Sequence, residues 1–331
     1  MFDRRHFIAT ASAAAAVPLV PRVAQAAPFD LGDATVLRNR TLAFLSQLQP
    51  EQAAAARFPL DGDVQRNWNF FGVGGYIKPG FRLEQMNALQ KERAWDVLAA
   101  ILSERGLQKA RDVMTLQQVM IDVGDGATSR GAERFSLAIF GEPAASNRWL
   151  IRLEGHHLSL TYTVEKDRLV EVTPSSFSVN PNRVQSGRFA GLNTLKREDT
   201  VARRLASDFT LDVRRQVFFQ ERPFGNILTS AGREASLTKR IGASVGSFGA
   251  AQRELVLQIV DAYAAEHLAA PFAAGVTGRI LSGLDSAHFA FAGSTTVGEP
   301  AYYRLQGERF LIEFASVDAA GQHLHTVFHL T

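Results

Sequence analysis

Five histidines lie in two short segments of the chain, and their spacing suits metal binding. The first segment reads Gly155-His156-His157, and the second reads His323-Leu-His325, with His329 four residues further on. Side chains alternate between the faces of a strand, so His323 and His325 should share one face. Neutral imidazole is a ligand for zinc, copper, iron and nickel. We therefore predict a divalent metal, zinc or copper, held by His323 and His325 together with His156, His157 or, if Gly155 begins a turn, both.

An all-histidine ligand set leaves a coordination position open, which a catalytic metal requires. Glu154 precedes the first histidine pair, and Glu313 lies in an apolar strand segment, where a carboxylate can serve as an acid–base group. Tyr303 and Arg304 can donate hydrogen bonds to an anionic or carbonyl group. We expect Glu313, Glu154, Arg304 and Tyr303 to be the catalytic residues. The alternative for all these side chains is a structural role, as polar strand residues bound to neighbours or water.

Composition excludes several other chemistries. Of the 331 residues, 46% are hydrophobic and 21% are charged, which is typical of a globular protein rather than a disordered one. Cysteine is absent, so disulfides, thiolate metal sites and cysteine nucleophiles are excluded. The sequence also lacks a Walker phosphate-binding loop and an H-E-x-x-H motif.

The N-terminus has the features of an export signal. The pair Arg4-Arg5 precedes an apolar run from Ile8 to Val20, and Ala24-Gln-Ala26 provides an A-x-A cleavage site. The arginine pair indicates a Tat-type signal peptide over residues 1–26, with the Sec route as the alternative. We expect a periplasmic or secreted protein that meets the Tat translocase during export. No later apolar run reaches the length of a membrane helix, so no membrane anchor is expected.

Cleavage also changes the charge balance. Loss of Arg4, Arg5, Arg22 and Asp3 lowers the formal net charge from +3 to +1. The remaining chain is nearly neutral and has no basic tract, so nucleic acid is not an expected partner. A small-molecule substrate or ligand is expected instead.

The spacing of apolar residues predicts an α+β fold. Helical spacing extends over residues 35–56, 83–104, 107–123, 192–219 and 252–268, and Gly106 is expected to end the second of these helices. Alternating segments between residues 135 and 173, and between 287 and 330, predict strands, whose short connections favour antiparallel pairing. We predict a single domain over residues 27–331, with helices packed on a mostly antiparallel sheet. Two closely packed lobes are the alternative.

Several segments together resemble the bacterial and fungal domain-of-unknown-function family 3500. They are Ile139-Phe-Gly-Glu-Pro143, residues 149–161, Thr173-Pro174, Gly191-Leu-Asn-Thr-Leu195 with Glu198, Phe289-Ala-Phe-Ala-Gly293, Tyr302-Tyr-Arg304, Leu311-Ile-Glu-Phe314 and His323-Leu-His325. The resemblance covers roughly residue 58 to the end and includes the histidine, arginine and glutamate positions named above. It departs at the C-terminus, where the family tends to have an arginine and an acidic-aromatic tail, so no role is transferred there.

Three classes of function remain open at this point. The first is an exported metal-dependent enzyme of hydrolase type, or an oxidative enzyme if the metal is copper. The second is a non-catalytic periplasmic protein that binds a metal or a small ligand. The third is a structural role in which the histidines are merely hydrogen-bonded.

Overall fold

The strands form where polar and apolar residues alternate. The computed structural model describes residues 30–72, 78–125 and 130–330. In β5 (Leu158–Glu165), the side chains at positions 158, 160, 162 and 164 are apolar and belong to the main hydrophobic core. The serine and threonines between them point to the other face of the sheet, as the two-residue period of a strand requires.

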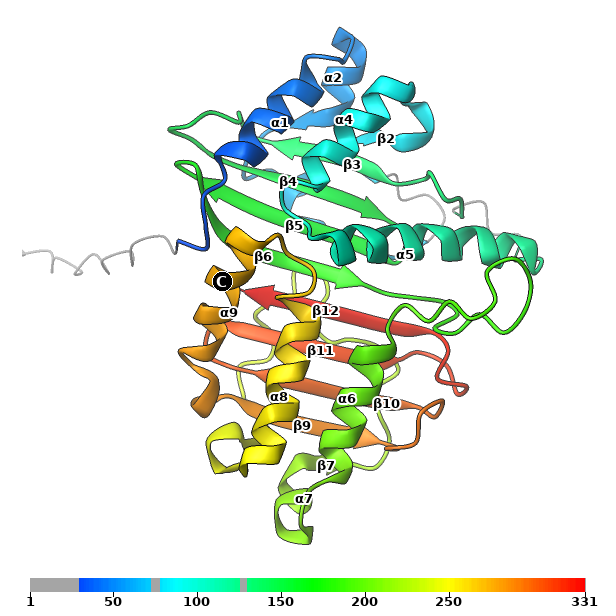
Figure 1. Ribbon diagram of the computed structural model, residues 1–331, viewed down its shortest axis with the longest axis vertical. Helices are drawn as coiled ribbons and strands as arrows, with labels where there is room; N and C mark the ends of the chain where they lie inside the picture. Colours follow the sequence, from blue (N-terminus) through cyan, green and yellow to red (C-terminus); the bar gives the residue numbers. More distant parts are fainter. Residues whose placement is uncertain (1–29, 73–77, 126–129, 331) are drawn as a thin grey trace, which may run out of the picture.

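These strands build one continuous, mostly antiparallel sheet (Figure 1). The other strands are β1 (Arg57–Phe58), β2 (Phe81–Arg82), β3 (Ser136–Phe140), β4 (Arg148–Gly155), β6 (Arg168–Phe177), β7 (Phe218–Gln220), β8 (Ala243–Ser244), β9 (His288–Gly293), β10 (Ala301–Gln306), β11 (Phe310–Ser316) and β12 (Leu324–Leu330). The order across the sheet is β1-β3-β4-β5-β6-β12-β11-β10-β9-β7, with β2 paired to β3 and β8 to β9. Two antiparallel meanders, β3 to β6 and β9 to β12, therefore meet where β6 pairs with β12.

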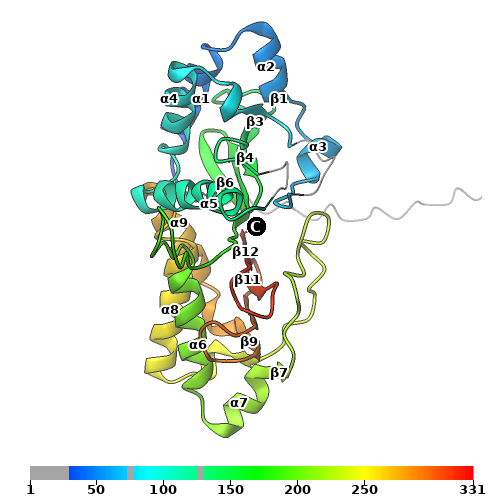
Figure 2. The same cartoon turned by 90° about the vertical axis from the view of Figure 1, so that its right-hand side faces the viewer.

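Helices cover one face of this sheet (Figure 2). They are α1 (Thr35–Leu45), α4 (Ala88–Leu98) and α5 (Glu104–Asp122) over the first meander, and α6 (Lys196–Ser207), α8 (Ala250–Tyr263) and α9 (Ala270–Leu281) over the second, with the shorter helices α2 (Pro50–Ala56) and α7 (Leu211–Val217) toward the periphery. The main core fills the space between these helices and the sheet. The short helix α3 (Asp63–Arg66) lies on the other side of the sheet (Figure 2). The predicted α+β fold, with helices on a mostly antiparallel sheet, is confirmed.

Two irregular segments cross the other face of the sheet. One is residues 67–72, and the other is residues 224–240, which we call the strap; it is the yellow-green segment opposite the helices in Figure 2. A smaller apolar cluster joins these segments to the sheet and includes Trp68, Phe70, Ile227, Tyr302 and Val327. Polar strand residues on this face are therefore buried by coil rather than exposed to water.

The expectation that Gly106 ends a helix is wrong. Gly106 lies in the first turn of α5, where its N–H binds the side chain of the N-cap residue Ser103 at 3.0 Å. A Cβ at this position would lie 2.2 Å from the carbonyl oxygen of His267. The glycine is therefore needed for close packing and does not mark a helix end.

The predicted signal peptide, residues 1–26, lies outside the described residues. Within the described part of the chain, no helix is both long and apolar enough to cross a membrane.

Candidate metal centre

A two-residue turn between β4 and β5 fixes the position of His157. Its N–H donates to the carbonyl of Phe70 at 2.7 Å, and its carbonyl accepts from the N–H of Ser178 at 2.8 Å. Its φ is +67°, a left-handed conformation that costs a non-glycine residue on the order of 1–3 kcal/mol. The adjacent Gly155 packs so tightly that a Cβ would lie 2.1 Å from the ring of Phe135. The turn thus holds one imidazole in a strained, closely packed position.

Three imidazoles converge beside this turn. The Nε2 atom of His323 lies 3.0 Å from Nε2 of His157 and 3.0 Å from Nε2 of His325. One ligand atom from each of the three residues lies within 4.8 Å of the others. Three nitrogens bound at 2.0–2.1 Å to a tetrahedral zinc ion are about 3.3 Å apart. The predicted approach of the two histidine segments is confirmed, and the buried group of His157, His323 and His325 could hold a metal ion.

The strap fixes which nitrogen of His325 faces this group. Oδ1 of Asn226 accepts a hydrogen bond from the N–H of Ile227 at 2.8 Å and lies 2.7 Å from Nδ1 of His325. Because a backbone N–H can only donate, this Asn226 atom is the oxygen, and Nδ1 of His325 must carry the hydrogen. Nε2 of His325 therefore presents a lone pair to the other two imidazoles, as a metal ligand does.

Hydrogen bonds alone cannot satisfy both short contacts of His323. A neutral imidazole carries at most one hydrogen on Nε2, which makes one linear hydrogen bond. If His323 donates to His325, no hydrogen remains for a linear bond to His157. If His157 donates to His323, the lone pairs of His323 and His325 face each other. A cation between the three nitrogens would resolve this conflict.

The surroundings keep these imidazoles neutral. Burial lowers the pKa of His157 and of His325 well below the usual histidine value, and the neighbouring imidazoles lower both further. Burial also lowers the pKa of His323, against the opposing effect of Asp318. Neutral imidazole is the form that binds a metal.

His156 lies beside the group but is not one of the three converging residues. Its ring centroid is 4.1 Å from that of His157, while its Nδ1 lies 3.3 Å from Nη1 of Arg130. Burial and the Arg130 charge lower the pKa of His156 to about 3, so Nδ1 accepts the hydrogen bond. Arg130 is held in turn by Asp125, at 2.7 Å. The structure therefore gives His156 an arginine as its partner.

The two glutamates expected to be catalytic each hold one of the irregular segments. Glu154, on β4, accepts a hydrogen bond from the N–H of Asn69, and burial raises its pKa. That segment places the rings of Phe70 and Phe71 at 4.9 and 5.9 Å from the ring of His325. Glu154 thus supports the aromatic wall of the centre.

Glu313, on β11, is fully buried and accepts four hydrogen bonds. They come from the N–H of Leu228 at 3.0 Å, the N–H of Thr229 at 2.9 Å, the hydroxyl of Thr229, and the hydroxyl of Tyr302 at 2.6 Å. Glu313 lies opposite Val327 in the sheet, and therefore on the same face as His325. Its carboxylate oxygens are therefore already hydrogen-bonded to the strap and to Tyr302.

The other two expected catalytic residues lie on opposite faces. Arg304 is opposite Glu313 and donates from Nη2 to the carbonyl of Lys239, in the strap, at 2.9 Å. Tyr303 points toward the helices, where its hydroxyl bonds the hydroxyl of Tyr263 at 2.8 Å and the carbonyl of Glu198 at 2.9 Å. The structure does not bring Tyr303 to the histidines, because successive strand residues alternate faces.

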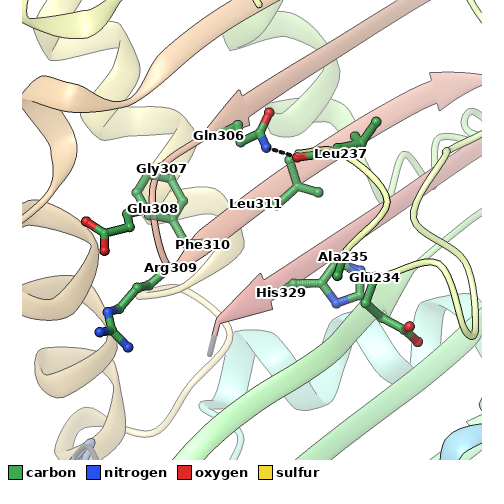
Figure 3. Close-up of a pocket in the computed structure, with 10 residues that line it drawn as sticks. All are labelled: Glu234, Ala235, Leu237, Gln306, Gly307, Glu308, Arg309, Phe310, Leu311 and His329. Atoms are coloured by element: carbon green, nitrogen blue, oxygen red, sulfur yellow. Dashed lines mark hydrogen bonds between the residues drawn. The ribbon is translucent and has the colours of Figure 1, made fainter. Parts of the chain in front are cut away.

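A separate cavity of about 250 Å³ lies where β10, β11 and β12 meet the far end of the strap (Figure 3). Its lining includes His329, Leu311, Gln306 and Leu237. His329 binds the carbonyl of Thr229 through Nε2 at 3.2 Å and is not part of the three-histidine group. This cavity is therefore distinct from the candidate metal centre.

Residues 242–246 match the serine-hydrolase pattern G-x-S-x-G, but their structure does not fit it. Ser244 has an ordinary φ of −67°, and its hydroxyl donates to the carbonyl of Asp285 at 2.9 Å. The strained strand-to-helix turn of a nucleophilic serine is not present at Ser244.

Sequence reasoning missed Asn226, Arg130 and the packing of Phe70 and Phe71 on His325. Asn226 lies in an irregular segment with no periodic pattern, so nothing in its neighbourhood indicates a histidine partner 99 residues away. The run of aromatic residues from 68 to 71 is visible in the sequence, but only the fold places it over a histidine.

The comparisons with known proteins agree with the resemblance seen in the sequence. A family model described as "Protein of unknown function (DUF3500)" matches residues 32–330. No curated protein and no solved structure matches the chain. Because the family match spans nearly the whole chain, the protein belongs to the DUF3500 family.

Proposed function

We propose that this protein binds a divalent metal ion, zinc or copper, through Nε2 of His157, His323 and His325. The observation that carries the proposal is the pair of 3.0 Å contacts between these nitrogens. The lone pair forced onto Nε2 of His325 by Asn226 supports it, because a ligating histidine commonly uses its other nitrogen for such a bond.

We further propose that the metal serves hydrolysis. Three neutral ligands leave the charge of the ion uncompensated, and a tetrahedral ion keeps a fourth position for water. A metal in such a site lowers the pKa of bound water toward 7 and so supplies hydroxide for attack on an ester, an amide or a similar bond. If the metal is copper, oxidative chemistry takes the place of hydrolysis.

Of the two glutamates first considered as proton acceptors, Glu154 fits this proposal better. Burial raises its pKa, and a raised pKa favours proton uptake by a carboxylate. The four donors around Glu313 instead occupy its oxygens. Arg304 donates a hydrogen bond to the strap, so we assign it a structural role in holding the strap against the sheet.

The alternative is an exported protein that binds a metal or a small ligand without catalysis. The burial of His157 and His325, which are 1% and 3% exposed, favours it because a closed site admits substrate poorly. For either function, the Tat-type signal predicted at residues 1–26 would direct the protein to the periplasm or out of the cell.

Metal analysis of protein purified from its native compartment tests the proposal. We expect close to one equivalent of zinc or copper in the wild type, and a loss of most of it in His157→Ala, His323→Ala and His325→Ala. His288→Ala is the matched control, because His288 lies on β9 and bonds the carbonyl of Ser286. Equal metal content in all four variants and the wild type would refute the site.

A further inference from the structure

The strap is fastened to the sheet at both of its ends by side chains of β10, β11 and β12. Near its start, Glu313 binds the strap at Leu228 and Thr229. Near its end, the amide nitrogen of Gln306 donates to the carbonyl of Leu237, the bond drawn in Figure 3. The strap is thus an irregular segment whose position depends on particular polar contacts.

The fastening at Glu313 lies next to the residue that orients His325. Asn226 precedes Leu228 by two residues, and its Oδ1 is the partner of Nδ1 of His325 at 2.7 Å. The Glu313 carboxylate supplies acceptors for three donors of the strap, namely the N–H of Leu228 and the N–H and hydroxyl of Thr229. A shift of this short stretch would move Asn226 relative to His325.

We propose that Glu313 is a positioning residue for the metal centre, acting through the strap and Asn226 on the tautomer and orientation of His325. The proposal rests on the proposed function, in which Nε2 of His325 is a metal ligand. It replaces the expectation that Glu313 is a base with a role as an anchor. Partners that orient metal-ligating histidines are typically worth 10- to 100-fold in metal affinity.

The affinity test compares zinc binding, measured by competition with a chelator, in four variants. Asn226→Ala removes the partner of His325, and Glu313→Gln places an amide N–H₂ against donors that need an acceptor. We expect each to weaken zinc binding about 10-fold or more. The double variant should bind no more weakly than Asn226→Ala alone, because both changes act through one contact. Gln306→Leu is the control, since it removes a contact only at the far end of the strap, and it should leave zinc affinity unchanged.

Additive weakening in the double variant would overturn the proposal, since it would mean that the Glu313 charge attracts the ion directly. Wild-type affinity in Glu313→Gln would overturn it as well. If Glu313→Gln does not fold, Thr229→Val removes one donor to the same carboxylate while keeping the side-chain shape. We then expect a several-fold weakening, and no change would contradict the proposal.

A second readout does not need a bound metal. Nitrogen-15 spectra of histidine-labelled, metal-free protein report which ring nitrogen carries the hydrogen. We expect His325 to be protonated at Nδ1 in the wild type and in Gln306→Leu, and to lose this preference in Glu313→Gln. An unchanged Nδ1–H form in Glu313→Gln refutes the anchoring role even if the wild type binds no metal. Failure of zinc binding with the expected tautomer change refutes only the proposed function.

Discussion

The Nε2 atoms of His157 and His323 lie 3.0 Å apart although 166 residues separate the two histidines in the chain. His157 belongs to the first meander of the sheet, and His323 leads into the last strand of the second. A metal bound between them would join the two meanders on the side of the sheet opposite the main layer of helices.

Replacement of His157 by glycine should separate metal binding from folding. Glycine adopts a φ of +67° without the strain that histidine bears there, so the variant should stay folded. We expect the loss of bound zinc together with a cooperative thermal unfolding transition. His156→Ala should keep its zinc, because His156 is bound to Arg130 outside the three-nitrogen group. Full zinc binding by His157→Gly would count against the ligand assignment.

The metal-free protein should lose stability in acid, partly through His267. Burial lowers the pKa of His267 well below its usual value, so the folded protein binds fewer protons than the unfolded chain. The stability due to neutral His267 is complete above about pH 6.5 and falls by about 1.4 kcal/mol for each pH unit below it. Denaturant titrations between pH 7 and 5 should show a flatter dependence in His267→Gln. A slope in His267→Gln equal to that of the wild type would contradict the assignment to His267.

Tyr303 should contribute to the stability of the fold and not to metal binding. Tyr303→Phe removes the hydroxyl that bonds Tyr263 and the carbonyl of Glu198 in the helix-facing core. We expect the free energy of unfolding to fall by about 1 kcal/mol, with zinc affinity unchanged. Chemical denaturation and chelator competition measure the two effects separately. Weaker zinc binding with an unchanged free energy of unfolding would show that Tyr303 contributes to the metal centre.

Export is predicted to depend on the arginine pair at residues 4 and 5. Replacement of both by lysine should block transport if the signal is of Tat type, because that machinery reads the twin arginines. Mass spectrometry of the exported wild-type protein should find an N-terminus at or near Ala27. Normal export of the lysine variant would indicate the Sec route, and an uncleaved cytoplasmic product would contradict export altogether.

The parts of the fold that follow from periodicity could be predicted from the sequence. Alternation in β5 and β12 predicts strands, and it places His323 and His325 on one side of the chain. The prediction that Gly106 ends a helix was wrong because glycine is common just after the last residue of a helix. Here close packing against the backbone of His267 requires a glycine within the helix. Local signals cannot show which distant backbone atom will approach a residue.

The histidines of the candidate site could be found in the sequence, but the residues that hold them in place could not. Two histidine segments suffice to suggest a metal, and the fold selects His157 over His156 through a turn conformation that the sequence does not specify. Asn226 and the anchoring of the strap by Glu313 depend on long-range contacts made by an irregular segment. Contacts of this kind leave no periodic pattern in the sequence, so they can be recognised only in the folded structure.

X-ray absorption at the metal edge, on protein purified with its native metal, tests the central claim most directly. We predict a first shell of three imidazole nitrogens, at about 2.0–2.1 Å for zinc, together with one oxygen ligand such as water. His325→Ala should lose one imidazole from this shell or lose the metal. A metal coordinated without imidazole, or a wild-type protein that takes up no metal, would contradict the three-histidine centre.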